Sequence, residues 1–266
     1  MVQDRGLAAQ RHRPLSGSRR RLLALETATR ATSVALLCGE DLVAERAVAL
    51  GRDAAESLLP AVEDLLRGAG CELAAIEAFA LSIGPGSFTG LRVGIATVKG
   101  LAFGTPRPVA PVSTLAALAV GAGRADVPVV PMLDARRGEV YAAAYAGGEP
   151  LARPIVAEGV YTPEELADRV GGPCLLVGEG AVLFGDRVAA RLGGGVRRAA
   201  PEQADPHARH VGALGARVLE RGEGVDAAEL VPRYLRRAQA EVVRTGARFE
   251  AGEEVARDRS RGEKPF

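Results

Sequence analysis

Tryptophan is absent from this sequence of 266 residues, and aromatic residues make up only 4% of it. Proteins that stack the bases of single-stranded nucleic acids need such rings, so a module of that kind is not expected. The net charge is only +1, which gives no reason to expect a strongly basic binding surface. The remaining composition, 47% hydrophobic and 25% charged, is ordinary for a globular protein with one large or two smaller domains.

Cysteine and long apolar runs are also scarce. Cys38, Cys71 and Cys174 are odd in number and far apart, so they predict neither a disulfide framework nor a C-x-x-C pair. No run of about 18 apolar residues predicts a membrane-spanning helix. The arginine-rich N-terminus lacks the apolar stretch of a secretory signal. We therefore expect a cytoplasmic protein that makes no membrane contact and keeps its cysteines reduced.

Only three histidines occur, which leaves little material for metal or Ser-His-Asp chemistry. His12 lies in the basic N-terminal stretch, whereas His207 and His210 stand one helical turn apart and close to Asp205. Zinc accepts ligands of this kind. The same segment also fits a helix start, with Asp205 as the N-cap and Pro206 at the first helical position, and this second interpretation is favoured.

Strand-like and helix-like patterns alternate along the chain. Three strands joined by short turns come first, at 21–26, 33–38 and 42–47. A helix, a strand, a helix, a strand and a helix follow, at 52–67, 78–83, 88–103, 109–112 and 114–120. This order predicts an α/β fold in which helices flank a mixed sheet, as in ribonuclease H-like proteins.

A stretch with two glycines at 121–126 divides the chain in two. In the second part we expect strands at 127–133, 139–145 and 175–177 and helices that begin near Thr162 and Pro206. The predicted organisation is a disordered basic extension at 1–20, an N-terminal subdomain at 21–120, a C-terminal subdomain at 121–241 and a polar flexible tail at 242–266.

The most informative segment, at 84–100, reads GPGSFTGLRVGIATVKG and joins an apolar strand to a helix of small residues. Gly90 and Gly94 lie on one face of that helix, where another segment can approach closely. The spacing fits neither a Rossmann fingerprint, nor a nucleophile elbow, nor a P-loop. The loop is therefore either a tightly packed turn, which is favoured, or an anion site at a helix N-terminus. The candidate anion contacts in the loop are Gly84, Gly86 and Ser87.

A second polar cluster follows the strand at 127–133. It contains two arginines with acidic and aromatic neighbours: Asp134, Arg136, Arg137, Glu139 and Tyr141. Arg136 and Arg137 are further candidate contacts for a phosphate or a carboxylate. The alternative is a salt-bridged hairpin, which is slightly favoured. The segment at 232–236, PRYLR, similarly either packs back on the sheet or contacts a partner.

Six segments together resemble the TsaB family, bacterial proteins of tRNA threonylcarbamoyladenosine biosynthesis that were once grouped with the M22 glycoproteases. The segments are 26–29 (ETAT), 33–35 (SVA), 84–92 (GPGSFTGLR), 112–115 (VSTL), 134–141 (DARRGEVY) and 232–236 (PRYLR). The resemblance covers about residues 21–241, and GPGSFTGLR is highly specific. Two positions depart from the family pattern: Glu26 replaces the usual Asp, which weakens a nucleotide site there, and Ala54 replaces a frequent histidine.

The resemblance implies an actin-like fold of two related halves. It also implies a role in attaching threonylcarbamoyl to the adenosine next to the anticodon of tRNAs that read codons beginning with A. The chain would then be no enzyme but a non-catalytic scaffold subunit, which binds the catalytic subunit TsaD together with TsaE and meets tRNA indirectly. ATP and metal are expected on the partner subunits and not on this chain. A stand-alone M22-like metallopeptidase or transferase is the alternative.

In the catalytic paralogue, the helix after the strand at 109–112 carries an H-x-x-x-H metal pair. The matching positions of this sequence hold Thr114 and Leu118. Neither side chain binds a metal ion as histidine does. The resemblance therefore implies no catalytic, cofactor-binding or metal-binding residues in this chain.

The resemblance further implies that the helices at about 53–67 and 88–103 form the contact with TsaD. The same face could pair with a second copy, so a homodimer in isolation is expected as well. The candidate interface residues, which sequence alone cannot divide between core and surface, are Leu58, Val62, Ser87, Phe88, Gly90, Leu91, Gly94, Ile95, Thr97 and Val98.

Overall fold

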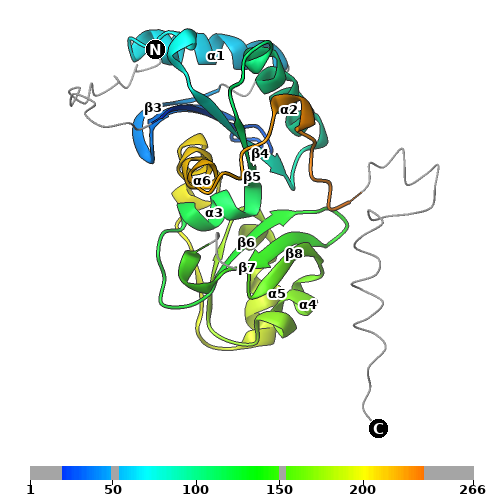
Figure 1. Ribbon diagram of the computed structural model, residues 1–266. Helices are drawn as coiled ribbons and strands as arrows, with labels where there is room; N and C mark the ends of the chain where they lie inside the picture. The colour runs from blue at the N-terminus through cyan, green and yellow to red at the C-terminus, as the bar shows by residue number, and fades with distance from the viewer. Residues whose placement is uncertain (1–19, 49–53, 150–153, 237–266) are drawn as a thin grey trace, which may run out of the picture.

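The computed structural model describes residues 20–48, 54–149 and 154–236 (Figure 1). The predicted extension at 1–20, apart from Arg20, and the predicted tail at 242–266 lie outside these ranges. The strands are β1 (Arg21–Glu26), β2 (Ser33–Cys38), β3 (Asp41–Ala47), β4 (Ala78–Gly84), β5 (Val109–Ser113), β6 (Val129–Asp134), β7 (Val140–Ala144), β8 (Val156–Tyr161), β9 (Cys174–Val177) and β10 (Val196–Arg198). The α-helices are α1 (Ala54–Gly68), α2 (Phe88–Ala102), α3 (Thr114–Gly121), α4 (Pro163–Val170), α5 (Glu179–Leu192) and α6 (Ala208–Glu220).

The chain runs through the same arrangement twice. The first sheet has the strand order β3-β2-β1-β4-β5 and the second has the order β8-β7-β6-β9-β10. In both sheets the first three strands are antiparallel neighbours, and the last two continue in parallel from the first. In both halves one helix precedes the fourth strand, one precedes the fifth and one follows it. This order confirms the predicted α/β, ribonuclease H-like and actin-like fold of two related halves.

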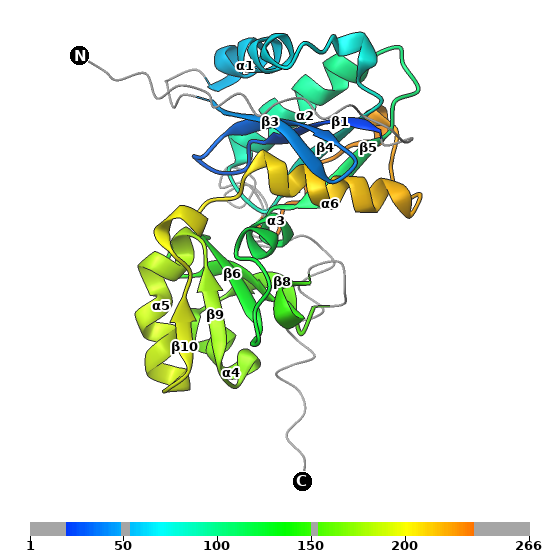
Figure 2. The same cartoon turned by 90° about the vertical axis from the view of Figure 1, so that its left-hand side faces the viewer.

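Strand β1 is buried on both faces of the first sheet. Leu23 and Leu25 pack in one core with α1 and α2, whereas Leu22 and Ala24 belong to another core with α3 and α6. Successive side chains of a strand point to opposite faces, so a strand that is covered on both sides is apolar throughout. Figure 2 shows α1 and α2 on the outer side of this sheet and α6 on the side toward the second half.

The last helix of each half joins the two halves. Helix α6 packs across β1, β2, β4 and β5 of the first sheet, and α3 packs against β6 of the second sheet and against α6. The core that results is continuous from the first sheet through both helices to β6 and β9. The halves are therefore held together by buried apolar packing, not by a surface contact alone.

Sequence patterns missed three elements of the second half, β8, α5 and β10. The helix signal of α5 is weak because Gly180 and Gly185 interrupt it and its N-cap, Gly178, offers no side chain. In the structure these glycines make room for neighbours: a Cβ atom on Gly180 would lie 2.8 Å from the carbonyl carbon of Met132. Tertiary packing thus explains the glycines that hide the helix.

Helix α6 begins at Ala208, two residues later than the predicted start at Pro206, so Asp205 is not its N-cap. The first N–H groups of the helix find acceptors in the first half of the molecule. The N–H of Ala208 donates to Ser33 Oγ at 2.9 Å, and the N–H of Arg209 donates to Oε1 of a glutamate on β3 at 3.0 Å. Distant residues cap this helix, which local sequence could not reveal.

Among the described residues, no helix combines the length and the apolar character that crossing a bilayer requires.

Candidate functional site

The loop between β4 and α2 and the first turn of α2 pack closely against a neighbouring turn. A Cβ atom on Gly86 would overlap with the carbonyl oxygen of Ala28, and one on Gly90 would overlap with that of Thr27. The N–H of Ser87, which an anion site at this helix start would use, already donates to the Ala28 carbonyl at 2.6 Å. The glycines thus let α2 press against the turn between β1 and β2, and the geometry favours the packing interpretation over the anion site.

The structure divides the ten predicted interface residues between core and surface. Ser87 is exposed, and Phe88, Gly90 and Thr97 are partly exposed. Six are buried: Leu58, Val62, Leu91, Gly94, Ile95 and Val98. The absence of a side chain at Gly94 serves the chain's own packing, because a Cβ atom there would overlap with the hydroxyl of Thr27. A partner could contact these six positions only if the core opened.

A different set of residues forms the outward side of α1 and α2. Leu59 on α1 is 46% exposed, and Phe103, directly after α2, is 88% exposed. Ala96 and Gly100 lie exposed on α2, and a Cβ atom on Gly100 would meet no atom within 4 Å. Positions 96, 100 and 103 recur at helical spacing, so periodicity could have identified this face from the sequence.

Glu26 is the last residue of β1, and its side chain is fully buried. Its Oε1 accepts a hydrogen bond from the N–H of Ala28 at 2.6 Å. Burial raises the pKa of Glu26 to about 7, an effect that the Ser82 side chain and backbone N–H groups oppose and the charge of Asp205 reinforces. The group therefore titrates near neutral pH.

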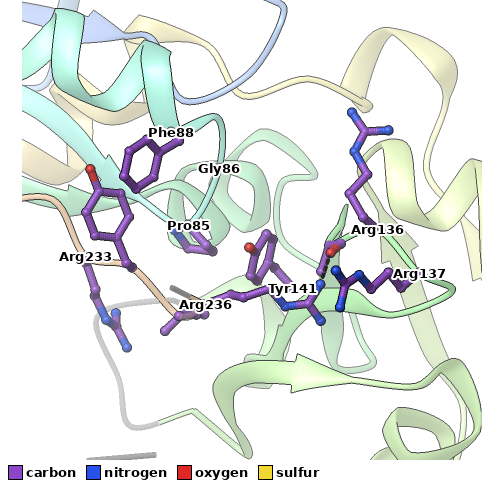
Figure 3. Close-up of a pocket in the computed structure, with 11 residues that line it drawn as sticks. Pro85, Gly86, Phe88, Arg136, Arg137, Tyr141, Arg233 and Arg236 are labelled. Carbon is purple, nitrogen blue, oxygen red and sulfur yellow. Dashed lines mark hydrogen bonds between the residues drawn. The ribbon is translucent and has the colours of Figure 1, made fainter. Parts of the chain in front are cut away.

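Three of the segments that carry the family resemblance meet at a pocket of about 310 Å³ between the two halves (Figure 3). They are the loop before α2, the turn between β6 and β7, and the C-terminal segment 231–236, which we call the strap. The pocket is lined by Pro85, Gly86, Phe88, Ala135, Arg136, Arg137, Tyr141, Arg233, Tyr234, Leu235 and Arg236. Only the fold brings these distant segments together.

The strap is attached to the first half by its backbone and by a ring stack. The N–H of Arg233 donates to the carbonyl oxygen of Ile83 at 2.7 Å. The ring of Tyr234 stacks on that of Phe88 with 4.5 Å between centroids. Arg92 covers Phe88 at 3.8 Å from the ring centroid, and its Nε donates to the Tyr234 hydroxyl at 3.1 Å. Two sequence motifs that lie more than a hundred residues apart thus form one cluster.

The same strap is attached to the second half by a buried leucine and two ion pairs. Leu235 is 2% exposed and packs against the β6–β7 turn and β8. Arg233 Nη1 lies 2.7 Å from Glu158 Oε2, and Arg236 pairs with Glu139. The strap therefore packs back on the fold and spans both halves, as one of the two interpretations of PRYLR predicted.

The turn between β6 and β7 holds two arginines in a conformation that only glycine adopts freely. The φ angles of Arg136 and Arg137 are 66° and 57°. Asp134 accepts from the N–H of Arg136 at 2.7 Å and pairs with its guanidinium at 3.1 Å. The predicted salt-bridged hairpin is present, and both arginines also line the pocket.

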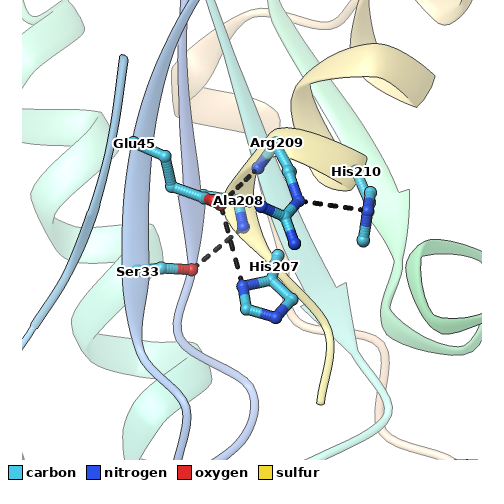
Figure 4. A network of polar contacts seen from close by, with 6 residues as sticks. All are labelled: Ser33, Glu45, His207, Ala208, Arg209 and His210. Carbon is cyan, nitrogen blue, oxygen red and sulfur yellow. Dashed lines mark hydrogen bonds and ion pairs between the residues drawn. The ribbon is translucent and has the colours of Figure 1, made fainter. Parts of the chain in front are cut away.

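His207 and His210 belong to a network of polar contacts at the start of α6 (Figure 4). His207 Nδ1 lies 3.9 Å from Glu45 Oε1, and Arg209 Nε donates to His210 Nε2 at 3.3 Å. Burial lowers the pKa of His210 to about 4, with smaller effects of Arg209 and His207 in the same direction. The residues that the structure describes contain no group of three or more His, Cys, Asp or Glu that could hold a metal ion.

The two positions that we matched to the metal pair of the catalytic paralogue are buried. Thr114 and Leu118 are both 0% exposed. Leu118 belongs to the apolar core between the halves, and the hydroxyl of Thr114 has no hydrogen-bond partner among the described residues. One hydroxyl beside a leucine is not a donor set that fits a metal ion.

Comparison with known proteins shows which family this chain resembles. The family model described as TsaD, tRNA N6-adenosine threonylcarbamoyltransferase, matches residues 49–243. The tRNA threonylcarbamoyladenosine biosynthesis protein TsaB of Escherichia coli (strain K12) is 40% identical over 166 residues, which are 60% of this chain and 71% of that protein. The protein of the same name from Bacillus subtilis (strain 168) is 31% identical over 227 residues, 83% of this chain and 96% of the relative.

Solved structures include a similar protein. YeaZ from Pseudomonas aeruginosa superposes with a TM-score of 0.66 at 36% sequence identity, over 81% of this chain and 99% of that chain. The sequence comparisons and the solved structure agree, and the chain belongs to the TsaB family of tRNA threonylcarbamoyladenosine biosynthesis proteins.

Proposed function

We propose that this chain acts in tRNA threonylcarbamoyladenosine biosynthesis as a non-catalytic scaffold subunit. It docks on the catalytic subunit TsaD, TsaE joins the pair, and the complex brings the tRNA to the reaction. The observation that carries the proposal is the outward face of α1 and α2, where Leu59, Ala96, Gly100 and Phe103 are exposed. Helix α5 of the second half also exposes Val182 and Leu183, but ion pairs tie it to α4, whereas no described ion pair joins α1 to α2.

Helices α4 and α5 are closed against each other. Arg187 pairs with Glu164 at 2.7 Å and Arg191 pairs with Asp168 at 2.6 Å, each through two guanidinium nitrogens. Helices α1 and α2 touch each other much less. Their outward side offers exposed apolar and small residues, and such residues let a partner helix approach closely.

The proposed absence of catalysis in this chain is supported by the burial of two residues on α3. A metal-dependent transferase or peptidase needs ligands with access to substrate. Thr114 and Leu118 are buried in the core instead. We therefore assign the reacting groups, the metal and the ATP to the partner subunits.

The docking face is tested by co-purification with TsaD. Gly100→Arg places a long charged side chain where a Cβ atom has open space, so the fold is retained while a docked helix is displaced. We expect pairing at least tenfold weaker, about 1.4 kcal/mol. Gly172→Arg is the matched control, because it makes the same change in open space near α4. Equal pairing by the Gly100→Arg variant and the wild type would contradict the proposed face.

Gly94→Leu does not serve as this test. A side chain at Gly94 would collide with Thr27 inside the chain, so lost pairing would report lost folding. The same Gly100→Arg variant, studied alone, also tests the homodimer. If two copies pair through this face, the variant will be monomeric at concentrations where the wild type is dimeric.

The alternative function, a stand-alone metallopeptidase or transferase, makes an opposite prediction. The purified chain with ATP and divalent metal ions, but without TsaD, should then turn over substrate. We expect no hydrolysis of ATP or peptide above the level without protein. Robust turnover by the chain alone would replace the scaffold proposal with the enzymatic one.

A further inference from the structure

The turn at 135–138 carries a cost that a plain hairpin would avoid. Residues other than glycine at positive φ are destabilised by about 1 kcal/mol or more each. Asn or Gly would fit the positive φ angles of Arg136 and Arg137 better. Backbone strain of this kind concentrates at functional sites, and the two side chains line the pocket between the halves. The arginines are therefore placed there for what their side chains do.

Arg236 of the strap is tied to the same turn. Nε of Arg236 is buried and has no hydrogen-bond partner among the described residues. Its other nitrogens donate to Glu139 and to the carbonyl oxygen of Ala135. An N–H group buried in this way does not reach a ligand in the pocket, so Arg236 fixes the strap against the turn and the more exposed guanidinium groups of the lining face the opening.

The carboxylates that pair with Arg233 and Arg136 position these two guanidinium groups and do not use all of their N–H donors. Glu158 is 9% exposed, whereas its partner Arg233 is 45% exposed; Asp134 is 15% exposed, whereas Arg136 is 76% exposed. The acids thus lie beneath and the guanidinium groups lie toward solvent. Each guanidinium has five N–H donors, of which these pairs use one or two.

We propose that this pocket binds a phosphate group of a phosphate ester. Several guanidinium groups around one opening match the fork-like hydrogen bonding that phosphate oxygens accept. The volume of about 310 Å³ admits a phosphate with a small organic portion. The stacked rings of Phe88 and Tyr234 form the apolar rim beside it. This site is separate from the outward face of α1 and α2 and goes beyond the docking role proposed above.

The test is a binding titration of the full chain alone. Binding is measured by calorimetry and by the shift of the thermal unfolding midpoint. The probes are inorganic phosphate, adenosine monophosphate and an RNA hairpin, with sodium chloride of equal ionic strength as the reference. Saturable binding of phosphate is expected. Tighter binding of the nucleotide than of phosphate would identify a small ester as the source of the group, and tighter binding of the hairpin would identify RNA.

The decisive variant is Arg137→Asn, because Asn tolerates a positive φ and removes the guanidinium. We expect phosphate affinity at least tenfold lower with an unfolding midpoint that is unchanged or higher. Arg124→Asn is the matched control, since Arg124 is exposed and does not line the pocket. Unchanged phosphate binding in Arg137→Asn, an equal loss in Arg124→Asn, or no saturable binding by the wild type would each overturn the proposal. None of these measurements includes TsaD, so this proposal and the docking proposal can fail separately.

Discussion

The two halves of the molecule share one order of strands and helices but differ in the ion pairs on their outer helices. In the second half, α4 and α5 are joined by two bidentate ion pairs across their exposed sides. In the first half, the described ion pairs of α1 involve Asp64 and run to Arg46 on β3 and to Arg67 within the helix. The outer helices of the second half are thus held together by ion pairs, whereas α1 and α2 of the first half are not joined in this way among the described residues. The first half is the one proposed to dock on a partner.

The loops after the fourth strand of each half make a second comparison. Gly84-Pro85-Gly86 begins with the last residue of β4, and Gly178-Glu179-Gly180 follows β9. The first glycine has a φ of 123° in one loop and 102° in the other. The second glycine lies directly against the backbone of the neighbouring strand or turn in both. The repeated pattern shows that these glycines serve packing, in a place where sequence motifs also suggest anion binding.

The largest expected effect tests that reading of the glycines. Gly86→Ala places a Cβ atom on the carbonyl oxygen of Ala28, which cannot move without shifting the β1–β2 turn. We expect a loss of unfolding free energy of about 3 kcal/mol, at the upper end of overpacking effects, measured by urea denaturation. Gly180→Ala is the counterpart in the second half. Its Cβ atom would lie 2.8 Å from Met132, so a smaller loss is expected.

The opposite ranking of these two variants would break the comparison. Gly100→Ala supplies the control within α2, because its Cβ atom has open space. That variant should gain about 0.5–1 kcal/mol from helix propensity. If Gly86→Ala were as well tolerated as Gly100→Ala, packing could not explain the glycine at 86.

The sequence predicted the first half better than the second for a physical reason. The strands of the first sheet other than β3 are short apolar runs between clear turns, so their pattern is local. In the second half, β8 contains Gly159 and the largely buried Glu158, and α5 contains glycines that fit against neighbouring elements. These residues make sense only once the neighbours are in place, so local patterns did not reveal the elements.

The candidate site could be predicted in its parts but not in its assembly. The sequence identified the loop at 84–92, the turn at 134–141 and the strap as informative segments. Their meeting depends on how α3 and α6 set one half against the other, which no local pattern encodes. Burial of Leu91, Ile95 and Val98 was equally hidden, since a helix with apolar residues around most of its surface does not show which side faces the core.

A second prediction uses the carboxylates that end the first strand of each half, Glu26 on β1 and Asp134 on β6. Unfolded glutamate loses its proton near its ordinary pKa of 4.5, whereas buried Glu26 loses it at about 7. The folded chain binds more protons between these values, so stability falls as the pH rises from about 4.5 through 7. Glu26→Gln removes this dependence. The variant should gain relative to the wild type with rising pH, by about 3 kcal/mol above pH 7.

Urea denaturation of both proteins across this pH range measures the difference. Asp134→Asn is the control at the equivalent strand end, where the carboxylate is 15% exposed and hydrogen-bonded to Arg136. A constant difference between Glu26→Gln and the wild type at all pH values would mean that the buried carboxyl does not ionise in the folded chain within this range.

The smallest expected effect concerns the ion pairs that close the second half. Arg187→Gln removes the bidentate contact with Glu164, whose pKa the guanidinium holds below its ordinary value. Both side chains are about half exposed, so water and salt screen the attraction and the loss of stability should be slight. The urea midpoint should fall a little at low salt and coincide with that of the wild type at molar salt. Pairing with TsaD should stay at the wild-type level, because α5 lies outside the proposed docking face. A loss of pairing in this variant, as large as that in Gly100→Arg, would show that the two helix pairs do not differ in the way their surfaces suggest.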